Sequence, residues 1–317
     1  MLARDTRGWL GLGLRGMAMG AADLVPGVSG GTVAFIAGIY EELLDTLGGL
    51  GWPTVTSLFT AGPAATWKRY NLGFLMALVL GIGTSVFLLA GALHHLLAEH
   101  PVLLWSFFFG LVAASVPLML RDVPRKAWDG VTACFLTFGA ALAWWLTGLP
   151  PLMQGDHPLF LFVAGAIAIC AMILPGISGS FILVILGAYS AVIGALKSLD
   201  VIRVLAFASG ALTGLLGFSK GLGWVFRRHR QWAVALLSGF LIGSLRKLWP
   251  WKENVRELFT HSDGRVEFLQ DNVAPGMHAN PQMASAVGCM VAGAFLVAGL
   301  AFLANAGTRS EGNQKAA

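Results

Sequence analysis

The residues of this sequence that could carry out chemistry lie in two copies of one short motif. The first motif, residues 26–32, has the sequence PGVSGGT, and the second motif, residues 175–180, has the sequence PGISGS. Proline and glycine interrupt a helix, serine caps the helix that follows, and glycine leaves backbone N–H groups accessible to a ligand. Because a helix N-terminus carries about half a positive charge, each motif predicts a binding site for an anionic group such as a phosphate.

Close helix packing is the alternative explanation of each motif, because small residues let membrane helices approach one another. The presence of two copies favours binding over packing. The breaks are expected at Pro26, Gly27, Pro175 and Gly176. We predict that the phosphate-binding residues are Ser29, Gly30, Gly31, Thr32, Ser178, Gly179 and Ser180.

Several ionisable residues lie in or beside apolar segments, where such residues are costly and suggest function. Arg15 and Lys220 are expected to attract the phosphate, and the alternative is that both extend to the cytoplasmic surface. Asp23 and Glu41 are candidates for proton coupling. For Asp23 the alternative is a local hydrogen bond that caps the break. For Glu41 it is a position at the membrane interface.

The composition places these motifs in an integral membrane protein. The chain has 317 residues, of which 56% are hydrophobic and 12% charged, whereas soluble proteins have about 25% charged residues. Apolar runs recur that are long enough to cross a bilayer as helices of about 20 residues. This excludes a secreted disulfide-rich protein and a disordered one. The residues that give the net charge of +5 lie between apolar segments, so no nucleic-acid partner is expected.

The hydropathy pattern predicts an all-α, multi-pass protein made of two related halves. The first half, residues 1–150, is expected to hold a broken re-entrant hairpin at about 8–50 and spans at about 72–97, 102–120 and 131–149. The second half, residues 151–317, is expected to hold a broken hairpin at about 158–196 and spans at about 204–226, 232–245 and 284–303. In the extramembrane loop at about 246–283, a short interfacial helix is expected at 252–259 and an extended strand at 265–268.

The number of crossings predicts how the halves are oriented. A hairpin enters and leaves on one side, so a hairpin plus three spans makes an odd number of crossings. The second half is then inverted relative to the first. Most Lys and Arg residues fall on one side when both termini are cytoplasmic, in agreement with the positive-inside rule. Two inverted breaks suit a carrier that works by alternating access.

The two motifs and their surroundings resemble one family, the bacterial undecaprenyl-phosphate (polyprenyl-phosphate) translocases. The similar stretches are ADLVPGVSGGT at 22–32 with GIYE at 38–41, MILPGISGSF at 172–181 with LGAY at 186–189, and LWPW at 248–251. The resemblance covers most of the chain. It implies transport of the carrier lipid undecaprenyl phosphate from the outer to the inner leaflet of the bacterial cytoplasmic membrane. The resemblance also implies that the lipid returned to the inner leaflet is recycled for cell-wall (peptidoglycan) and surface-glycan synthesis.

Two other functions are compatible with parts of the sequence pattern. A phosphatase would need a nucleophilic or acid–base histidine beside the phosphate, but all seven His lie away from both motifs in the sequence, so an enzyme is not expected. No metal or cofactor site is expected either, because no paired metal ligands or P-loop are present. A transporter or channel for another small anion or anionic lipid remains the alternative. The expected partners are the polyprenyl phosphate, membrane lipids and protons, with a homo-oligomer left open.

Overall fold

The computed structural model describes residues 6–25, 28–151, 155–260 and 266–314, and most of them are helical. Long apolar segments in four helices could each cross a membrane: α6 (Leu72–Glu99), α7 (Pro101–Leu120), α12 (Val201–Ser244) and Met283–Phe302 of α13 (Met283–Gln314). Two shorter apolar helices are α8 (Gly130–Leu146) and α9 (Pro158–Ile173). These helices confirm the prediction of a helical protein with several apolar helices of membrane-spanning length.

The helix α12 is bent at His229, where φ is −141° and ψ is 54°. The spans expected at 204–226 and 232–245 are therefore the two parts of this one helix. The same backbone conformation separates α6 from α7 at His100, where φ is −132° and ψ is 50°. His100 and His229 are matching positions in the two halves of the sequence.

Each of the two broken regions contains three helices. The first holds α1 (Thr6–Asp23), α2 (Gly30–Ile36) and α3 (Tyr40–Gly49). The second holds α9, α10 (Gly179–Ile185) and α11 (Tyr189–Lys197). A hairpin broken once, at its motif, would have only two helical arms; the third helix arises because a second turn follows each motif, at Gly38 and Gly187. Both have φ of +70°, a conformation that glycine adopts without strain. At the second of these turns α10 and α11 meet at 106°.

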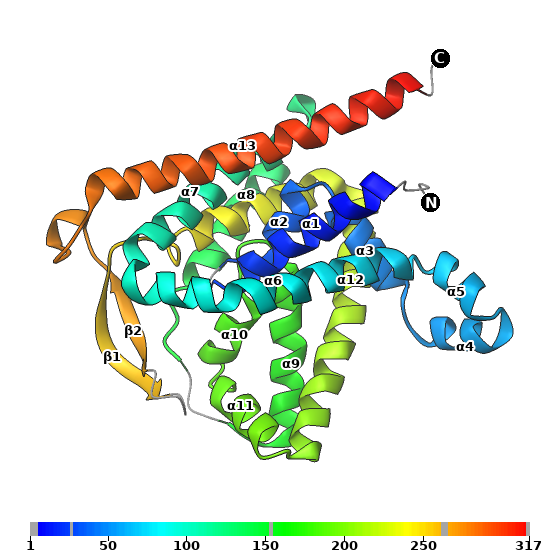
Figure 1. Ribbon diagram of the computed structural model, residues 1–317, viewed down its shortest axis with the longest axis horizontal. Helices are drawn as coiled ribbons and strands as arrows, with labels where there is room; N and C mark the ends of the chain where they lie inside the picture. The colour runs from blue at the N-terminus through cyan, green and yellow to red at the C-terminus, as the bar shows by residue number, and fades with distance from the viewer. Residues whose placement is uncertain (1–5, 26–27, 152–154, 261–265, 315–317) are drawn as a thin grey trace.

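The third apolar segment of each half packs against the other half. The helix α13 packs along α7, and α8 packs along the part of α12 that follows the bend (Figure 1). The buried core lies where α1, α2, α3, α7 and α12 meet, and its largest fully buried side chains include Tyr40, Leu44 and Leu237. The two halves therefore form one interlocked body.

The pair of helices α4 (Trp52–Thr60) and α5 (Pro63–Arg69) and a β-hairpin lie outside the main helical body (Figure 1). Helices α4 and α5 project from one side. Two short 3₁₀ turns are η1 (Arg125–Ala127) and η2 (Pro275–Met277). Strands β1 (Lys252–Thr260) and β2 (Val266–Asn272) form an antiparallel hairpin. The interfacial helix expected at 252–259 was wrong. Pairing with β2 satisfies the backbone of this stretch, and β2 includes residues 266–268 of the strand expected at 265–268.

Candidate functional site

The two motifs, far apart in the sequence, meet in the structure. Ser29 Oγ donates a hydrogen bond to the carbonyl of Met172 at 3.0 Å. The backbone N–H of Gly176 donates to Thr32 Oγ1 at 3.0 Å. Ser29 and Thr32 are both fully buried. A third bond adds to this contact, because Tyr40 OH donates to the carbonyl of Ile173 at 3.0 Å.

The first motif is capped by groups of its own half. Ser29 Oγ accepts from the N–H of Gly31 at 3.1 Å, and Asp23 Oδ1 accepts from the N–H of Gly30 at 2.7 Å. The N–H of Thr32 donates to the carbonyl of Ser29. The Asp23 carboxylate therefore lies at the N-terminus of α2, where a negative group is stabilised by the helix dipole. A phosphate that bound the N–H of Gly30 would have to displace it.

The second motif is arranged differently. Ser178 precedes α10 without a side-chain capping bond, and its hydroxyl lies 2.8 Å from that of the exposed Ser180. Pro175 and Gly176 are buried where α9 ends, and Gly176 has φ of +88°. Both hydroxyls could turn toward a ligand oxygen, because neither is committed to the backbone of α10.

The side chain of Lys247, which is not among the predicted phosphate-binding residues, lies beside the second motif. Lys247 Nζ is 4.5 Å from the centre of the Phe181 ring, and Phe181 directly follows Ser180. Lys247 lies in the turn that follows α12, 67 residues further along the chain than Ser180. In the sequence, its position beside Trp249 and Trp251 favours an interfacial belt, with attraction of a phosphate on the outer face as the alternative.

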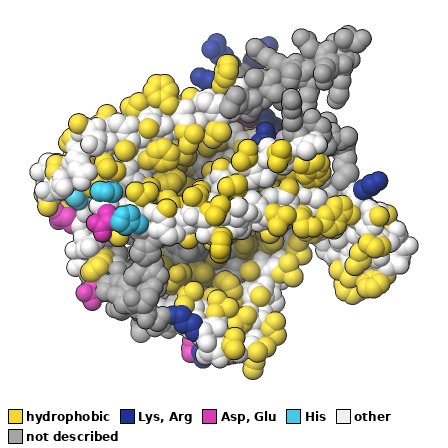
Figure 2. All heavy atoms as spheres, in the orientation of Figure 1, with side chains coloured by type: hydrophobic (Ala, Val, Ile, Leu, Met, Phe, Trp, Pro, Cys, Tyr) yellow, Lys and Arg dark blue, Asp and Glu magenta, His cyan; other side chains and the backbone are white. Residues whose placement is uncertain are grey.

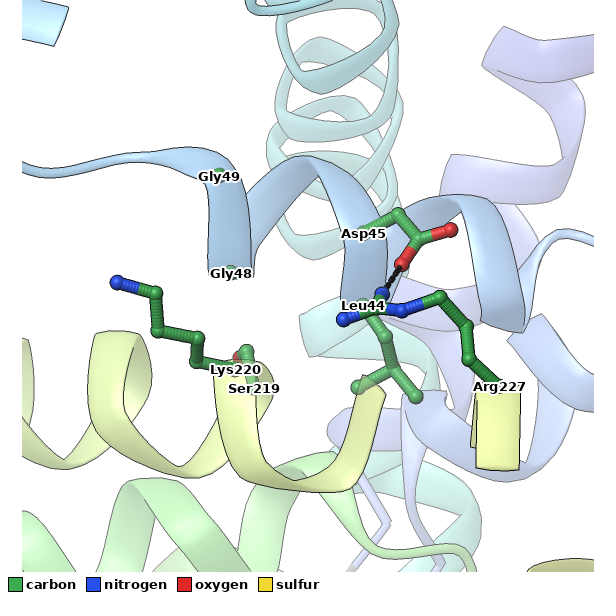
Figure 3. Close-up of a pocket in the computed structure, with 7 residues that line it drawn as sticks. All are labelled: Leu44, Asp45, Gly48, Gly49, Ser219, Lys220 and Arg227. Atoms are coloured by element: carbon green, nitrogen blue, oxygen red, sulfur yellow. Dashed lines mark hydrogen bonds and ion pairs between the residues drawn. The ribbon is translucent and has the colours of Figure 1, made fainter. Parts of the chain in front are cut away.

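The predicted cations Arg15 and Lys220 take no part in the described hydrogen bonds between the two motifs. Pro26 and Gly27 lie outside the described residues. Arg15 is half-buried on α1, which packs along α6. Lys220 lines a cavity of about 180 Å³ between α3 and α12 (Figure 3). None of the seven predicted phosphate-binding residues of the two motifs lines this cavity.

Glu41 lies in a charged cluster that joins α3 to α12. Arg230 Nε donates to Glu41 Oε1 at 2.9 Å, and Arg230 Nη2 donates to Asp122 Oδ2 at 3.2 Å. One turn further along α3, Asp45 forms an ion pair with Arg227. The acidic residues of α3 thus pair with arginines that flank the bend of α12.

Comparison with known proteins identifies the family. Residues 19–266 match the family model described as undecaprenyl phosphate translocase-like. The chain belongs to this translocase-like family. A polyprenyl-phosphate transporter of Vibrio cholerae is 44% identical over 275 residues, which cover 86% of this chain and 88% of that protein. A polyprenyl-phosphate transporter of Staphylococcus aureus is 30% identical over 264 residues, covering 76% and 86%.

The match to the translocase-like family confirms the resemblance carried by the two motifs. It spans both motifs, the charged cluster and the cavity beside Lys220. The family description and the names of both relatives denote transport, in agreement with the expectation that the protein is not an enzyme. No solved structure matches the chain significantly.

Proposed function

We propose that this protein transports undecaprenyl phosphate, or a related polyprenyl phosphate, from the outer to the inner leaflet of the bacterial cytoplasmic membrane. The carrier lipid would then be recycled for the synthesis of cell wall and surface glycans. Two relatives named polyprenyl-phosphate transporters support the substrate. The observation that carries the proposal is the hydrogen-bonded contact between the two duplicated breaks.

In this proposal the phosphate head binds where the two motifs meet. Ser178, Ser180 and the N–H groups that open α10 would hold it, with Lys247 nearby to attract its charge. The first motif would contribute Ser29, Gly30, Gly31 and Thr32 once Asp23 leaves Gly30, and Arg15 would attract the phosphate along α1. The isoprenoid tail would remain in the lipid, next to the widely apolar surface that Figure 2 shows.

We propose further that the two halves are inverted repeats, with both termini in the cytoplasm, and that they exchange roles by alternating access. Matching helices begin at matching residues in the two halves, as α2 and α10 do at Gly30 and Gly179. The halves differ in how they pack on each other: α3 packs on the first part of α12, whereas α11 has no comparable packing against the matching helix α6. In the opposite state of the carrier, α11 would close on α6 and α3 would leave α12.

Proton coupling through Asp23 or Glu41 belongs to the same proposal. Each carboxylate makes a contact that protonation would weaken, with the N–H of Gly30 for Asp23 and with Arg230 for Glu41. A proton on Asp23 would free the N-terminus of α2 for the phosphate. A proton on Glu41 would loosen α3 from α12.

The test is transport by purified protein in proteoliposomes that contain undecaprenyl phosphate. The wild-type protein should move the lipid between leaflets, and Ser29→Leu and Ser178→Leu should abolish the movement while the protein remains monodisperse in detergent. Excess polyprenyl phosphate should compete, and inorganic phosphate at the same concentration should not. Normal transport by both variants would refute the site. Equal competition by inorganic phosphate would favour a carrier of small anions.

A further inference from the structure

Helices α4 and α5 form a helical hairpin at a place where the second half of the protein has a short connection. In the first half, residues 50–71 separate α3 from α6 and include both helices. In the second half, residues 198–200 alone separate α11 from α12. Figure 1 shows that the hairpin projects from the helical body on the side where α1 begins. Most of its surface is therefore left uncovered by the rest of the protein.

This hairpin has polar side chains inside and apolar side chains outside. Ser57 of α4 and Thr66 of α5 are buried, and their hydroxyl oxygens lie 3.0 Å apart. Trp52, Val55 and Phe59 form a stripe along α4, because residues three and seven positions apart share a helix face. The stripe lies opposite Ser57, and Trp52 and Phe59 are 77% and 83% exposed. Figure 2 shows hydrophobic side chains over this projecting part, which therefore needs an apolar environment.

The hydroxyl groups of the hairpin are satisfied without water. Every Ser and Thr hydroxyl of residues 51–69 has a partner within the hairpin at 2.9–3.2 Å: the N–H of Gly51 with Thr54, Thr56 with the carbonyl of Pro53, Thr60 with that of Thr56, Thr66 with that of Gly62, and Ser57 with Thr66. A polar group that enters hydrocarbon needs such an internal partner, because no water is there to replace it. The hairpin meets this condition.

The charges of the hairpin suit an anionic lipid surface. Helix α5 ends with Lys68 and Arg69, and both are exposed. Residues 46–98 include no Asp or Glu. Glu42, which comes from α3, accepts a hydrogen bond from Asn71 Nδ2 at 2.8 Å. Anionic headgroups of the cytoplasmic leaflet attract Lys and Arg beside a membrane segment. The two cations therefore fit the headgroups, while the stripe on α4 fits the acyl chains.

Two indole rings mark the level of the membrane surface at the base of the hairpin. A Cβ atom on Gly73, at the start of α6, would lie 3.0 Å from the Trp9 ring and 3.2 Å from Trp67 Nε1. Trp9 and Trp67 are 40% and 43% exposed. Tryptophan is enriched where a membrane helix passes the headgroups, because its ring is apolar and its N–H is polar. The start of α6, and with it the end of α5, therefore lies at headgroup level.

We propose that the α4–α5 hairpin is a lipid anchor that lies in the interface of the cytoplasmic leaflet. Trp52, Val55 and Phe59 enter the acyl region, and Lys68 and Arg69 contact anionic headgroups. The choice of leaflet rests on the proposed orientation of the termini, whereas the contact with lipid does not depend on the transported substrate. Because the hairpin joins α3 to α6, it holds this junction at the membrane surface.

The experiment measures the surroundings of a nitroxide spin label by EPR in the full-length protein, in nanodiscs of phosphatidylcholine and phosphatidylglycerol. The three native cysteines are replaced by serine, and the label is attached at Phe59→Cys. Phe87→Cys, at an 89% exposed position of α6, is the lipid control, and Lys126→Cys, at an exposed position of η1, is the water control. The label at 59 should be accessible to oxygen and protected from a neutral nickel complex, as at 87.

Two results at position 59 would overturn the proposal. Nickel accessibility equal to that at position 126 would mean that the stripe faces water. Low accessibility to both oxygen and nickel would mean that protein, such as a second copy of the chain, covers it. If the label lies in lipid but the wild-type protein moves no undecaprenyl phosphate in proteoliposomes, the proposed function fails and the lipid anchor stands.

A second measurement tests the contact with anionic headgroups. Phosphatidylglycerol should raise the apparent melting temperature of the wild-type protein in neutral detergent, and the double variant Lys68→Gln, Arg69→Gln should show a smaller rise. The matched control is Arg125→Gln, Lys126→Gln, which removes the same charge from two exposed residues of η1 and should keep the wild-type rise. Equal rises in all three proteins would overturn the assignment of Lys68 and Arg69 to anionic headgroups.

Discussion

The contact between the two motifs predicts the effect of removing a single oxygen atom. Thr32→Val keeps the shape of the side chain but removes the Oγ1 that accepts from the N–H of Gly176 at 3.0 Å. Thr32 is fully buried and Gly176 is buried, so water cannot replace the lost partner. An unsatisfied buried N–H costs about 1–3 kcal/mol, which corresponds to roughly 5- to 150-fold in an equilibrium constant. The variant should therefore be less stable, and its transport should be slower.

The matched control is Thr84→Val on α6. Thr84 Oγ1 donates to the carbonyl of Leu80 within its own helix at 2.7 Å, and the residue is exposed. Exposed substitutions of this kind change stability by about 0.5 kcal/mol or less. The assay is the apparent melting temperature in detergent, combined with the initial rate of lipid transport in proteoliposomes. If Thr32→Val melts and transports like Thr84→Val, the bond between the motifs contributes nothing and the reasoning is refuted.

Three further predictions concern Tyr40, the carboxylates of Asp23 and Glu41, and Lys252. Tyr40→Phe leaves the carbonyl of Ile173 without its donor and should lower stability by about 1 kcal/mol, measured by melting; an unchanged melting temperature would contradict it. An inward proton gradient should accelerate lipid transport in proteoliposomes, and Asp23→Asn or Glu41→Gln should remove this acceleration. A wild-type transport rate that is the same with and without the gradient would exclude proton coupling. Burial and the nearby charge of Lys247 hold the pKa of Lys252 well below its ordinary value of 10.5. The unfolded chain therefore binds more protons between the lowered pKa and 10.5, so stability rises with pH in that window. Lys252→Met should flatten this rise in a series of melting curves, and an unchanged slope would exclude Lys252 as its source.

The sequence predicted the parts of the fold that depend on local composition. Apolar runs identified the long helices, because a helix in a bilayer must be apolar over about 20 residues. Gly38 and Gly187 were visible in the sequence, but the turns they form depend on φ values that composition does not specify. The strand β1 was missed because its conformation depends on pairing with β2, which the local composition of 252–259 does not specify.

The candidate site was predicted in part. The duplicated motifs marked the two breaks, and the structure brings these breaks into contact through Ser29 and Thr32. Which cation accompanies which motif could not be predicted, because this depends on helix packing between distant segments. The bend and packing of α12 place Lys247 beside the second motif and Lys220 in a separate cavity. The pairing of Glu41 with Arg230 also depends on that packing.

The most direct test of the account follows the distribution of undecaprenyl phosphate between leaflets over time. The lipid is added to the outer leaflet of proteoliposomes, and the fraction that remains accessible from outside is measured at intervals. The account predicts that this fraction falls faster with the wild-type protein than in vesicles without protein, and that Ser178→Leu restores the slow rate. Equal rates for wild-type proteoliposomes and protein-free vesicles would contradict it.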